Sequence, residues 1–287
     1  MSDGFIPKRP VVTAYPKMPE AFAEVEAMAS FLKEMGVDAP HGSIYEEDLR
    51  KGVRSGEFDL LIIAGGDGSM LRAGHLCAPS RVPILGVNLG RIGFLLQVER
   101  TNWRDYFRKM FNGEAWIENR MMLRAEHMRA REPMGDWYAL NEAVVGRGQN
   151  LRPVRLTTSV DGRELISYVA DGLIAATPTG STAYALAAGG PILPPELRNI
   201  LLVPIAPHLS VDRAIVLSEG SSVSIIAQSE NAVLSVDGQS PISLTREDRI
   251  DVRAADVTAQ FVRFGDPGYF YRNLTAHMNE NSLGMPR

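Results

Sequence analysis

Apolar residues recur at intervals of three and four positions near the start of the chain. They are Phe22, Val25, Ala29 and Leu32. Pro19 stands before them and Gly36 follows them, which is the usual order of a helix start and a helix stop. The pattern predicts an amphipathic helix over 19–36.

Two later segments are apolar almost throughout and end in glycine. They are FDLLIIAGG at 58–66 and VPILGVNLG at 82–90. Continuous apolar runs are typical of strands buried on both faces, as in parallel sheets. Because such strands alternate with helices over the first hundred residues, we expect an α/β domain over 1–104 with an open, Rossmann-like parallel sheet.

The second half of the chain has a different pattern, in which short alternating runs are separated by turn residues. RLTTSVDGRELISY (155–168) and VLSVDGQSPISL (233–244) each carry an Asp-Gly pair, which is a strong hairpin signal. We expect a mostly-β, sandwich-like domain over 105–265. The segment TPTGSTAYALAAGG, residues 177–190, is predicted to add a short helix. Residues 266–287 are expected to form a tail that packs back on the N-terminal domain through its aromatic cluster.

Composition and charge limit the partners. The 287 residues include 30 basic and 34 acidic side chains, a net charge of −4, which gives no reason to expect nucleic-acid binding. Cys77 is the only cysteine, so a disulfide or zinc cluster within one chain is excluded and a reducing compartment is favoured. Neither a signal-peptide core nor an apolar run of ~20 residues occurs. We expect a soluble cytoplasmic protein with no membrane partner.

The segment Gly65-Gly66-Asp67-Gly68-Ser69 follows the first buried strand. A glycine turn between a strand and a helix N-terminus favours phosphate, because free backbone N–H groups and the helix dipole attract an anion. Ser69 is a candidate cap for a helix that begins near Met70. Asp67 has two interpretations. In the first, its side chain stabilises the turn by hydrogen-bonding its own backbone. In the second, it contacts a ligand, which is either a hydroxyl that attacks a phosphate or a metal bound to that phosphate.

Five motifs together resemble the NAD kinases in order and approximate spacing, between about residues 58 and 240. They are GGDGS (65–69), GVNLGRIGFL (86–95), ALNEAVVGRG (139–148), DGLIAATPTGSTAYALAAGGPI (171–192) and SVDGQ (235–239). The TPTGSTAY block is specific to that family. The GGDG element alone is also similar to one in lipid kinases and 6-phosphofructokinases.

The resemblance implies an enzyme that phosphorylates the 2′-hydroxyl of the adenosine ribose of NAD, with Asp67 as the proton acceptor. It also implies a set of NAD-binding residues: Asp67, Gly68, Phe94, Asn141, Glu142, Asp171, Thr179, Thr182, Ala183, Tyr184 and Asp237. Gly66, Arg72 and Arg91 follow as candidate phosphate-binding residues, although solvated arginines are an equal alternative. A divalent metal, Mg²⁺, would arrive with the donor, ATP or polyphosphate, and no metal is assigned to protein ligands. A homodimer or homotetramer is implied as well.

Some alternatives stay open at the level of sequence. Neighbouring side chains on a strand point to opposite faces, so Asn141 and Glu142 reach one ligand only if the chain bends after Leu140. Asp237 could be no more than a turn former. A kinase of another hydroxyl substrate, such as a lipid, and a nucleotide-binding regulator without turnover are the alternative functions. The sequence does not choose between ATP and polyphosphate, or between NAD and NADH.

Overall fold

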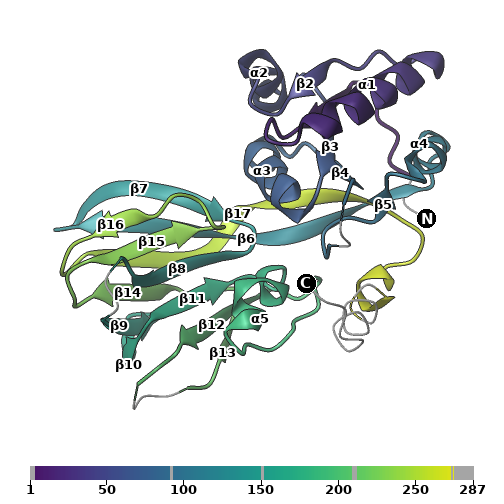
Figure 1. Cartoon of the computed structure of the whole chain (residues 1–287). Helices are drawn as coiled ribbons and strands as arrows, with labels where there is room; N and C mark the ends of the chain where they lie inside the picture. Colours follow the sequence, from purple (N-terminus) through teal and green to yellow (C-terminus); the bar gives the residue numbers. More distant parts are fainter. Residues whose placement is uncertain (1–3, 91–92, 150–151, 209–211, 273, 275–287) are drawn as a thin grey trace. The chain divides into compact units, whose positions relative to one another are not determined.

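The computed structural model describes residues 4–90, 93–149, 152–208, 212–272 and 274 (Figure 1). It divides into two compact units. The first comprises Met1–Asn119 together with Thr258–Arg287, and the second is Arg120–Val257. The chain passes between the units within two long strands, β6 (Ala115–Arg129) and β17 (Arg249–Phe264).

A parallel sheet forms the centre of the first unit. Its strands are β2 (His41–Ser43), β1 (Pro10–Ala14), β3 (Leu60–Gly65) and β4 (Ile84–Asn88) in spatial order, with the end of β17 and the short β5 (Val98–Glu99) also parallel to β4. Every residue of β1, β3 and β4 is buried. This burial explains the continuous apolar runs in the sequence and confirms the predicted α/β class.

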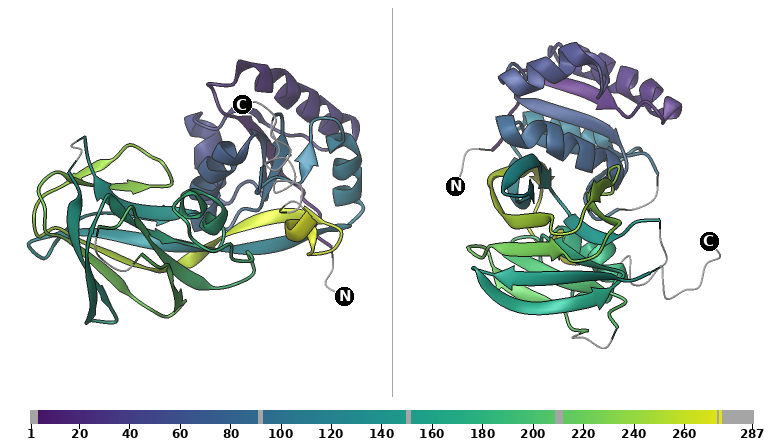
Figure 2. Two further views of the ribbon diagram at one scale, coloured as in Figure 1. Left: turned by 60° about the horizontal axis from the view of Figure 1, so that its bottom comes forward. Right: turned by 90° about the vertical axis from the view of Figure 1, so that its left-hand side faces the viewer.

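Helices cover the faces of this sheet (Figure 2). They are α1 (Pro19–Glu34), α2 (Glu47–Ser55), α3 (Asp67–Cys77), the 3₁₀ turn η1 (Ala78–Ser80) and α4 (Trp103–Phe111). The apolar sides of α1 and α4 pack on one face of the sheet, where Val25, Leu32 and Trp103 are buried with Ile62. The helix predicted over 19–36 is confirmed as α1, and Gly36 follows its end with a φ of +84°.

The helix after the glycine turn begins earlier than the sequence suggested. We expected Ser69 to cap a helix that starts near Met70, but α3 starts at Asp67, with Gly66 as its N-cap residue. Ser69 is buried instead, and a Cβ on Gly65 would lie 2.2 Å from the Ser69 hydroxyl oxygen. The serine therefore fills the space that the glycine leaves, and Asp67 becomes the first residue of the helix.

The second unit contains two antiparallel sheets. One has the order β13 (Ile215–Ser218), β12 (Asn199–Ile205), β11 (Gly172–Ala176), β8 (Glu142–Arg147), β15 (Ala232–Val236) and β16 (Ile242–Leu244). The other includes β10 (Arg163–Ala170), β9 (Val154–Val160), β14 (Val223–Ala227) and β17, and β6 pairs with β7 (Glu132–Ala139). Both predicted Asp-Gly hairpins are confirmed, as β9–β10 and β15–β16, and their turn residues have positive φ angles.

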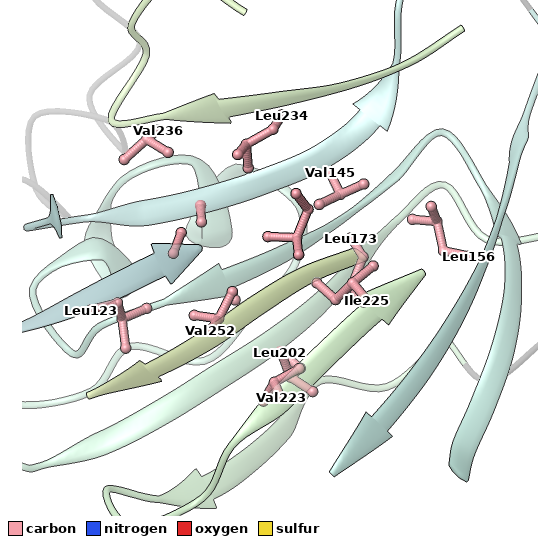
Figure 3. Close-up of a cluster of buried hydrophobic side chains, with 14 of the residues drawn as sticks. Leu123, Val145, Leu156, Leu173, Leu202, Val223, Ile225, Leu234, Val236 and Val252 are labelled. Carbon is pink, nitrogen blue, oxygen red and sulfur yellow. The ribbon is translucent and has the colours of Figure 1, made fainter. Parts of the chain in front are cut away.

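The core of the second unit lies between these sheets (Figure 3). Val145, Leu173 and Leu202 of the six-stranded sheet are buried in one cluster with Leu156 and Ile225 of the other sheet. Two sheets that bury their inner faces against each other form a β-sandwich. The predicted short helix appears as the 3₁₀ turn η2 (Gly180–Thr182) followed by α5 (Tyr184–Ala187).

Two expectations concern features that the described residues cover only in part. Of the tail predicted over 266–287, residues 273 and 275–287 lie outside the described residues. Tyr269 and Phe270 of its first half are buried, and the Tyr269 hydroxyl donates to Glu118 in the same unit. Within the described ranges, no helix combines the length and the apolar character that a bilayer crossing requires.

Candidate active site

Asp67 is held by a segment distant in sequence. Its Oδ2 accepts the backbone N–H of Phe94 at 2.9 Å, and its Oδ1 accepts that of Leu95 at 3.2 Å. A Cβ on Gly93 would lie 2.1 Å from Asp67 Oδ1, so this contact requires glycine there. Among the described residues, no hydrogen bond joins this carboxylate to its own turn, as the turn-former interpretation would require. The carboxylate is partly exposed at the first residue of α3.

Arg72 lies one helical turn further along α3. Its Nη1 donates to the carbonyl oxygen of Gly68 at 2.7 Å and its Nε to the Tyr45 hydroxyl at 3.2 Å. The guanidinium also lies 4.1 Å from the centre of the Tyr15 ring, which is cation–π distance. Arg72 is therefore fixed beside the exposed Gly68, whereas Arg91, the other candidate arginine, lies outside the described residues.

A second carboxylate organises the segment between β7 and β8. Asp237 accepts three backbone N–H groups, from Leu140 at 2.7 Å and from Asn141 and Glu142 at 2.9 Å each. Its own N–H donates to the carbonyl oxygen of Glu142 at 3.0 Å. The chain bends at Leu140 and Asn141, between the end of β7 and the start of β8, as the sequence required for this pair to reach one ligand.

Glu142 is the most perturbed acid of this group. Burial and, to a smaller extent, the nearby Asp237 raise the pKa of its carboxyl to about 8, and the hydrogen bond from the backbone N–H of Tyr184 acts in the opposite direction. Its Oε2 is buried and has no hydrogen-bond partner among the described residues. A buried polar oxygen without a partner is costly, so an incoming hydroxyl that donates to it would be favoured.

The segment 177–182 packs directly on the same bend. Thr177 donates its N–H to the Asn141 carbonyl at 2.8 Å and its hydroxyl to the Leu140 carbonyl at 2.6 Å. A Cβ on Gly180 would lie 2.2 Å from the Asn141 carbonyl oxygen. Glycine at 180 therefore allows the two segments to touch backbone to backbone.

The hydroxyl groups of this segment are already engaged. Thr179 accepts from Arg120 Nη1 at 3.1 Å, and Thr182 donates to the Thr179 carbonyl at 3.0 Å. The buried Ser181 donates to the Pro178 carbonyl at 2.6 Å. Thr182 and Ala183 are partly exposed and Tyr184 is exposed, so backbone groups and the Tyr184 ring form the accessible part of the segment.

A cavity of about 330 Å³ adjoins this segment in the second unit. Asp171 and Tyr184 line it together with Arg147, whose Nε lies 3.1 Å from Asp171 Oδ2. We did not select Arg147 from the sequence. The sequence feature that could have indicated Arg147 is its position in β8, a few residues after the Asn141–Glu142 pair.

The predicted residues thus form two groups, one in each unit. The first unit brings Asp67 together with Phe94, and Gly68 with Arg72. The second unit gathers the NE pair, Asp237 and the 177–184 segment. The start of a helix after a glycine turn favours a bound phosphate, and the partly exposed carboxylate of Asp67 there can accept a proton, so the arrangement fits an enzyme that phosphorylates a hydroxyl group.

Comparison with known proteins narrows this class. Residues 16–115 match the model of the ATP-NAD kinase N-terminal domain, and residues 140–264 match that of the ATP-NAD kinase C-terminal domain. The chain is 37% identical to the NAD kinase of Heliobacterium modesticaldum, over 88% of this chain and 92% of that protein. It is 42% identical to the NAD kinase of Symbiobacterium thermophilum, over 81% and 83%.

Solved structures that resemble this chain are also kinases of NAD or NADH. The yeast NADH kinase in complex with NADH has a TM-score of 0.82 and 26% identity, covering 98% of this chain and 90% of that one. An NAD kinase from Archaeoglobus fulgidus in complex with ATP has a TM-score of 0.76 and 28% identity, covering 93% and 97%. The chain belongs to the ATP-NAD kinase family, and its enzyme class is NAD kinase. These findings give no support to a lipid kinase.

Proposed function

We propose that this chain transfers the terminal phosphoryl group of ATP to the 2′-hydroxyl of the adenosine ribose of NAD, and that Asp67 accepts the hydroxyl proton. The observation that carries the proposal is the carboxylate of Asp67, which is partly exposed and oriented by the N–H groups of Phe94 and Leu95. An ionised carboxylate has about four acceptor positions, and these bonds occupy two of them. The remaining positions can receive the substrate hydroxyl.

The role of Asp67 is set by the nature of phosphoryl transfer. The transition state is loose, so bond formation to the attacking oxygen lags and positioning dominates. A carboxylate that orients the hydroxyl and takes its proton late contributes about 10²–10⁴-fold to the rate. Gly66 and Gly68 would let the phosphates approach the backbone, with Arg72 beside them as a fixed positive charge.

The second unit would bind the adenosine part of NAD. Asn141 would hydrogen-bond the adenine edge and Glu142 a ribose hydroxyl, which is supported by the unpartnered buried Oε2 of Glu142. Asp237 would contribute indirectly, because the three backbone hydrogen bonds that it accepts fix the bend that contains Asn141 and precedes β8. The remaining adenine contacts of this unit would come from Thr179, Thr182, Ala183 and Tyr184.

The nicotinamide amide would enter the cavity that Asp171 and Arg147 line. The two side chains form an ion pair at 3.1 Å and together offer both acceptor and donor groups. An amide needs both kinds of partner, because it carries a carbonyl oxygen and an NH₂ group.

We propose that the metal is Mg²⁺ and that it arrives with the donor. Within the described residues, no three or more His, Cys, Asp or Glu side chains form a group that could hold a metal ion. When bound, Mg²⁺ would neutralise charge on the triphosphate. A cytoplasmic location, a homodimer or homotetramer, and polyphosphate as a second donor belong to the same proposal.

The proposal is tested by assaying Asp67→Asn for NADP formation from NAD and ATP with Mg²⁺. We expect kcat to fall by about 10²–10⁴-fold while the KM for NAD changes little, because the lost group acts on the reacting hydroxyl. Repeating the assay with polyphosphate, with NADH and with a diacylglycerol acceptor defines the donor and the acceptor. Near-normal kcat in Asp67→Asn, or product only with the lipid, would overturn the proposal.

Asp59→Asn is the matched control for this experiment. The Asp59 carboxylate also accepts two backbone N–H groups, from Lys8 and Arg9, at 2.8 Å each, and it is also partly exposed in the first unit. The control variant therefore removes a similar charge and a similar pair of bonds. We expect it to keep the parent kcat.

A further inference from the structure

The loop that orients Asp67 is itself held by a buried arginine. Leu95 donates its N–H to Asp67 Oδ1 at 3.2 Å, and its carbonyl oxygen accepts from Arg263 Nη1 at 2.9 Å. One residue of the loop thus connects the carboxylate to the guanidinium. Leu95 and Arg263 are both buried, so water competes little for the hydrogen bond between them.

A side chain two residues further along fixes the same loop to the same strand end. Gln97 donates from Nε2 to the Phe264 carbonyl at 2.8 Å, and its Oε1 accepts the Phe264 N–H at 3.1 Å. Arg263 and Phe264 are the last two residues of β17. The segment from Leu95 to Gln97 is therefore tied to the end of one strand through both its backbone and a side chain.

Stability alone does not account for Arg263. The residue is 2% exposed, its Nε donates to Glu118 Oε2 at 2.8 Å, and its guanidinium lies 4.4 Å from the centre of the Tyr269 ring. Its Nη2 is buried and has no hydrogen-bond partner among the described residues. A buried ion pair is often no more stable than an apolar pair of the same volume, and an unpaired buried donor adds a cost.

We propose that Arg263 is a positioning residue for phosphoryl transfer, acting through Leu95 on the orientation of Asp67. The inference rests on the function proposed above for Asp67. Small displacements of a catalytic group are expensive, since a shift of about 1 Å can cost 10²-fold in rate. Arginine suits the task because its rigid fork can donate to Glu118 and to the Leu95 carbonyl at once, which the single ammonium of lysine does less well.

Arg263→Met is the first test, together with the double variant Glu118→Gln/Arg263→Met, which leaves no unpaired carboxylate. We expect kcat to fall about 10- to 100-fold in both, with little change in the KM for NAD. Amide hydrogen exchange at Phe94 and Leu95 should become faster. If kcat or the exchange rate matches that of the parent in the folded double variant, the inference is wrong.

Arg129→Met is the control for loss of an ion-paired guanidinium in the other unit, and its side chain is more exposed than that of Arg263. Arg129 donates two hydrogen bonds to Asp248, from Nε at 2.9 Å and from Nη2 at 2.8 Å, within the second unit. Removing this guanidinium should lower the stability but leave kcat, and exchange at Phe94 and Leu95, unchanged. A comparable fall in kcat in this control would mean that loss of any such ion pair impairs turnover, and it would overturn the specific role of Arg263.

Combining the substitutions separates the two proposals. In the Asp67→Asn background, Arg263→Met should cause little further loss of kcat, measured with labelled ATP, because the group that Arg263 orients is gone. Losses that multiply in full would show that Arg263 acts elsewhere. If Asp67→Asn alone keeps the parent kcat, the proposed role of Asp67 fails, whatever Arg263 does.

Discussion

At the scale of single residues, the protein uses three carboxyl groups in three different environments. Asp67 accepts two backbone N–H groups and stays partly exposed. Asp237 accepts three backbone N–H groups and stabilises the bend between β7 and β8. Glu142 is buried, and its pKa is raised to about 8. The same functional group therefore suits proton acceptance, backbone support or ligand hydrogen bonding according to its surroundings.

The raised pKa of Glu142 makes a prediction about stability. Between its ordinary pKa of 4.5 and about 8, the folded state holds more protons than the unfolded state, so this residue lowers the free energy of unfolding as pH rises through that range. Glu142→Gln removes this titration. Urea unfolding should show the variant gaining stability relative to the parent from about pH 5 to about pH 8 and no further gain above that.

Glu219→Gln provides the opposite case. The hydrogen bond from Arg198 lowers the pKa of Glu219, so that carboxylate supports folding at neutral pH and loses its contribution as the solution becomes acidic. We expect the free energy of unfolding of Glu219→Gln to show no gain relative to the parent between pH 5 and pH 8.

The outcome that would contradict the prediction for Glu142 is a stability difference between Glu142→Gln and the parent that does not vary with pH. Such a result would contradict the buried state of the Glu142 carboxyl.

At the scale of elements, the site depends on backbone segments that touch without side chains between them. Gly93 allows its loop to reach Asp67, and Gly180 allows the start of η2 to reach Asn141. In both places a Cβ would come within 2.2 Å of an oxygen atom. These glycines matter for close approach, since neither has a positive φ angle.

Gly180→Ala tests this view of the second unit. The new methyl group would overlap the Asn141 carbonyl, so the segments must separate at a cost of about 1–3 kcal/mol. We expect a lower free energy of unfolding and a higher KM for NAD, measured by urea unfolding and steady-state kinetics. Gly220→Ala is the control, because nothing lies within 4 Å of the position of its Cβ. Equal effects of the two substitutions would argue against a tight contact at Gly180.

At the scale of the whole molecule, the chain combines an α/β unit with a β-sandwich, and the first unit is completed by residues from both ends of the sequence. Its core includes Trp103 of α4 and Val262 of β17, which are far apart in the chain. The last strand residues therefore belong to the same folding unit as the glycine turn.

The single cysteine can report on the opening of this unit. Cys77, at the end of α3, is fully buried, and burial raises the pKa of its thiol. We expect a thiol reagent to label the native protein at least 10³-fold more slowly than the denatured protein, because labelling requires unfolding. Saturating NAD should slow it further if NAD binds only the folded state. Rapid labelling of native protein would contradict this burial.

The sequence by itself determined the class of fold and most elements, because hydrophobic periodicity and turn residues act over a few neighbouring positions. It indicated α1 and both Asp-Gly hairpins, and its motifs identified the family. The prediction that Ser69 caps a helix starting near Met70 was wrong, because it considered only the neighbouring residues. Ser69 is a good cap in isolation, but in the fold it is buried against Gly65.

Only the tertiary structure decided which groups hold the candidate site residues. Asp237 meets Leu140 across 97 positions, and Arg263 meets Leu95 across 168. No local pattern encodes such partners, because they depend on how distant strands and loops pack. The same holds for the burial that raises the pKa of Glu142, which follows from the surrounding segments and not from its neighbours in the sequence.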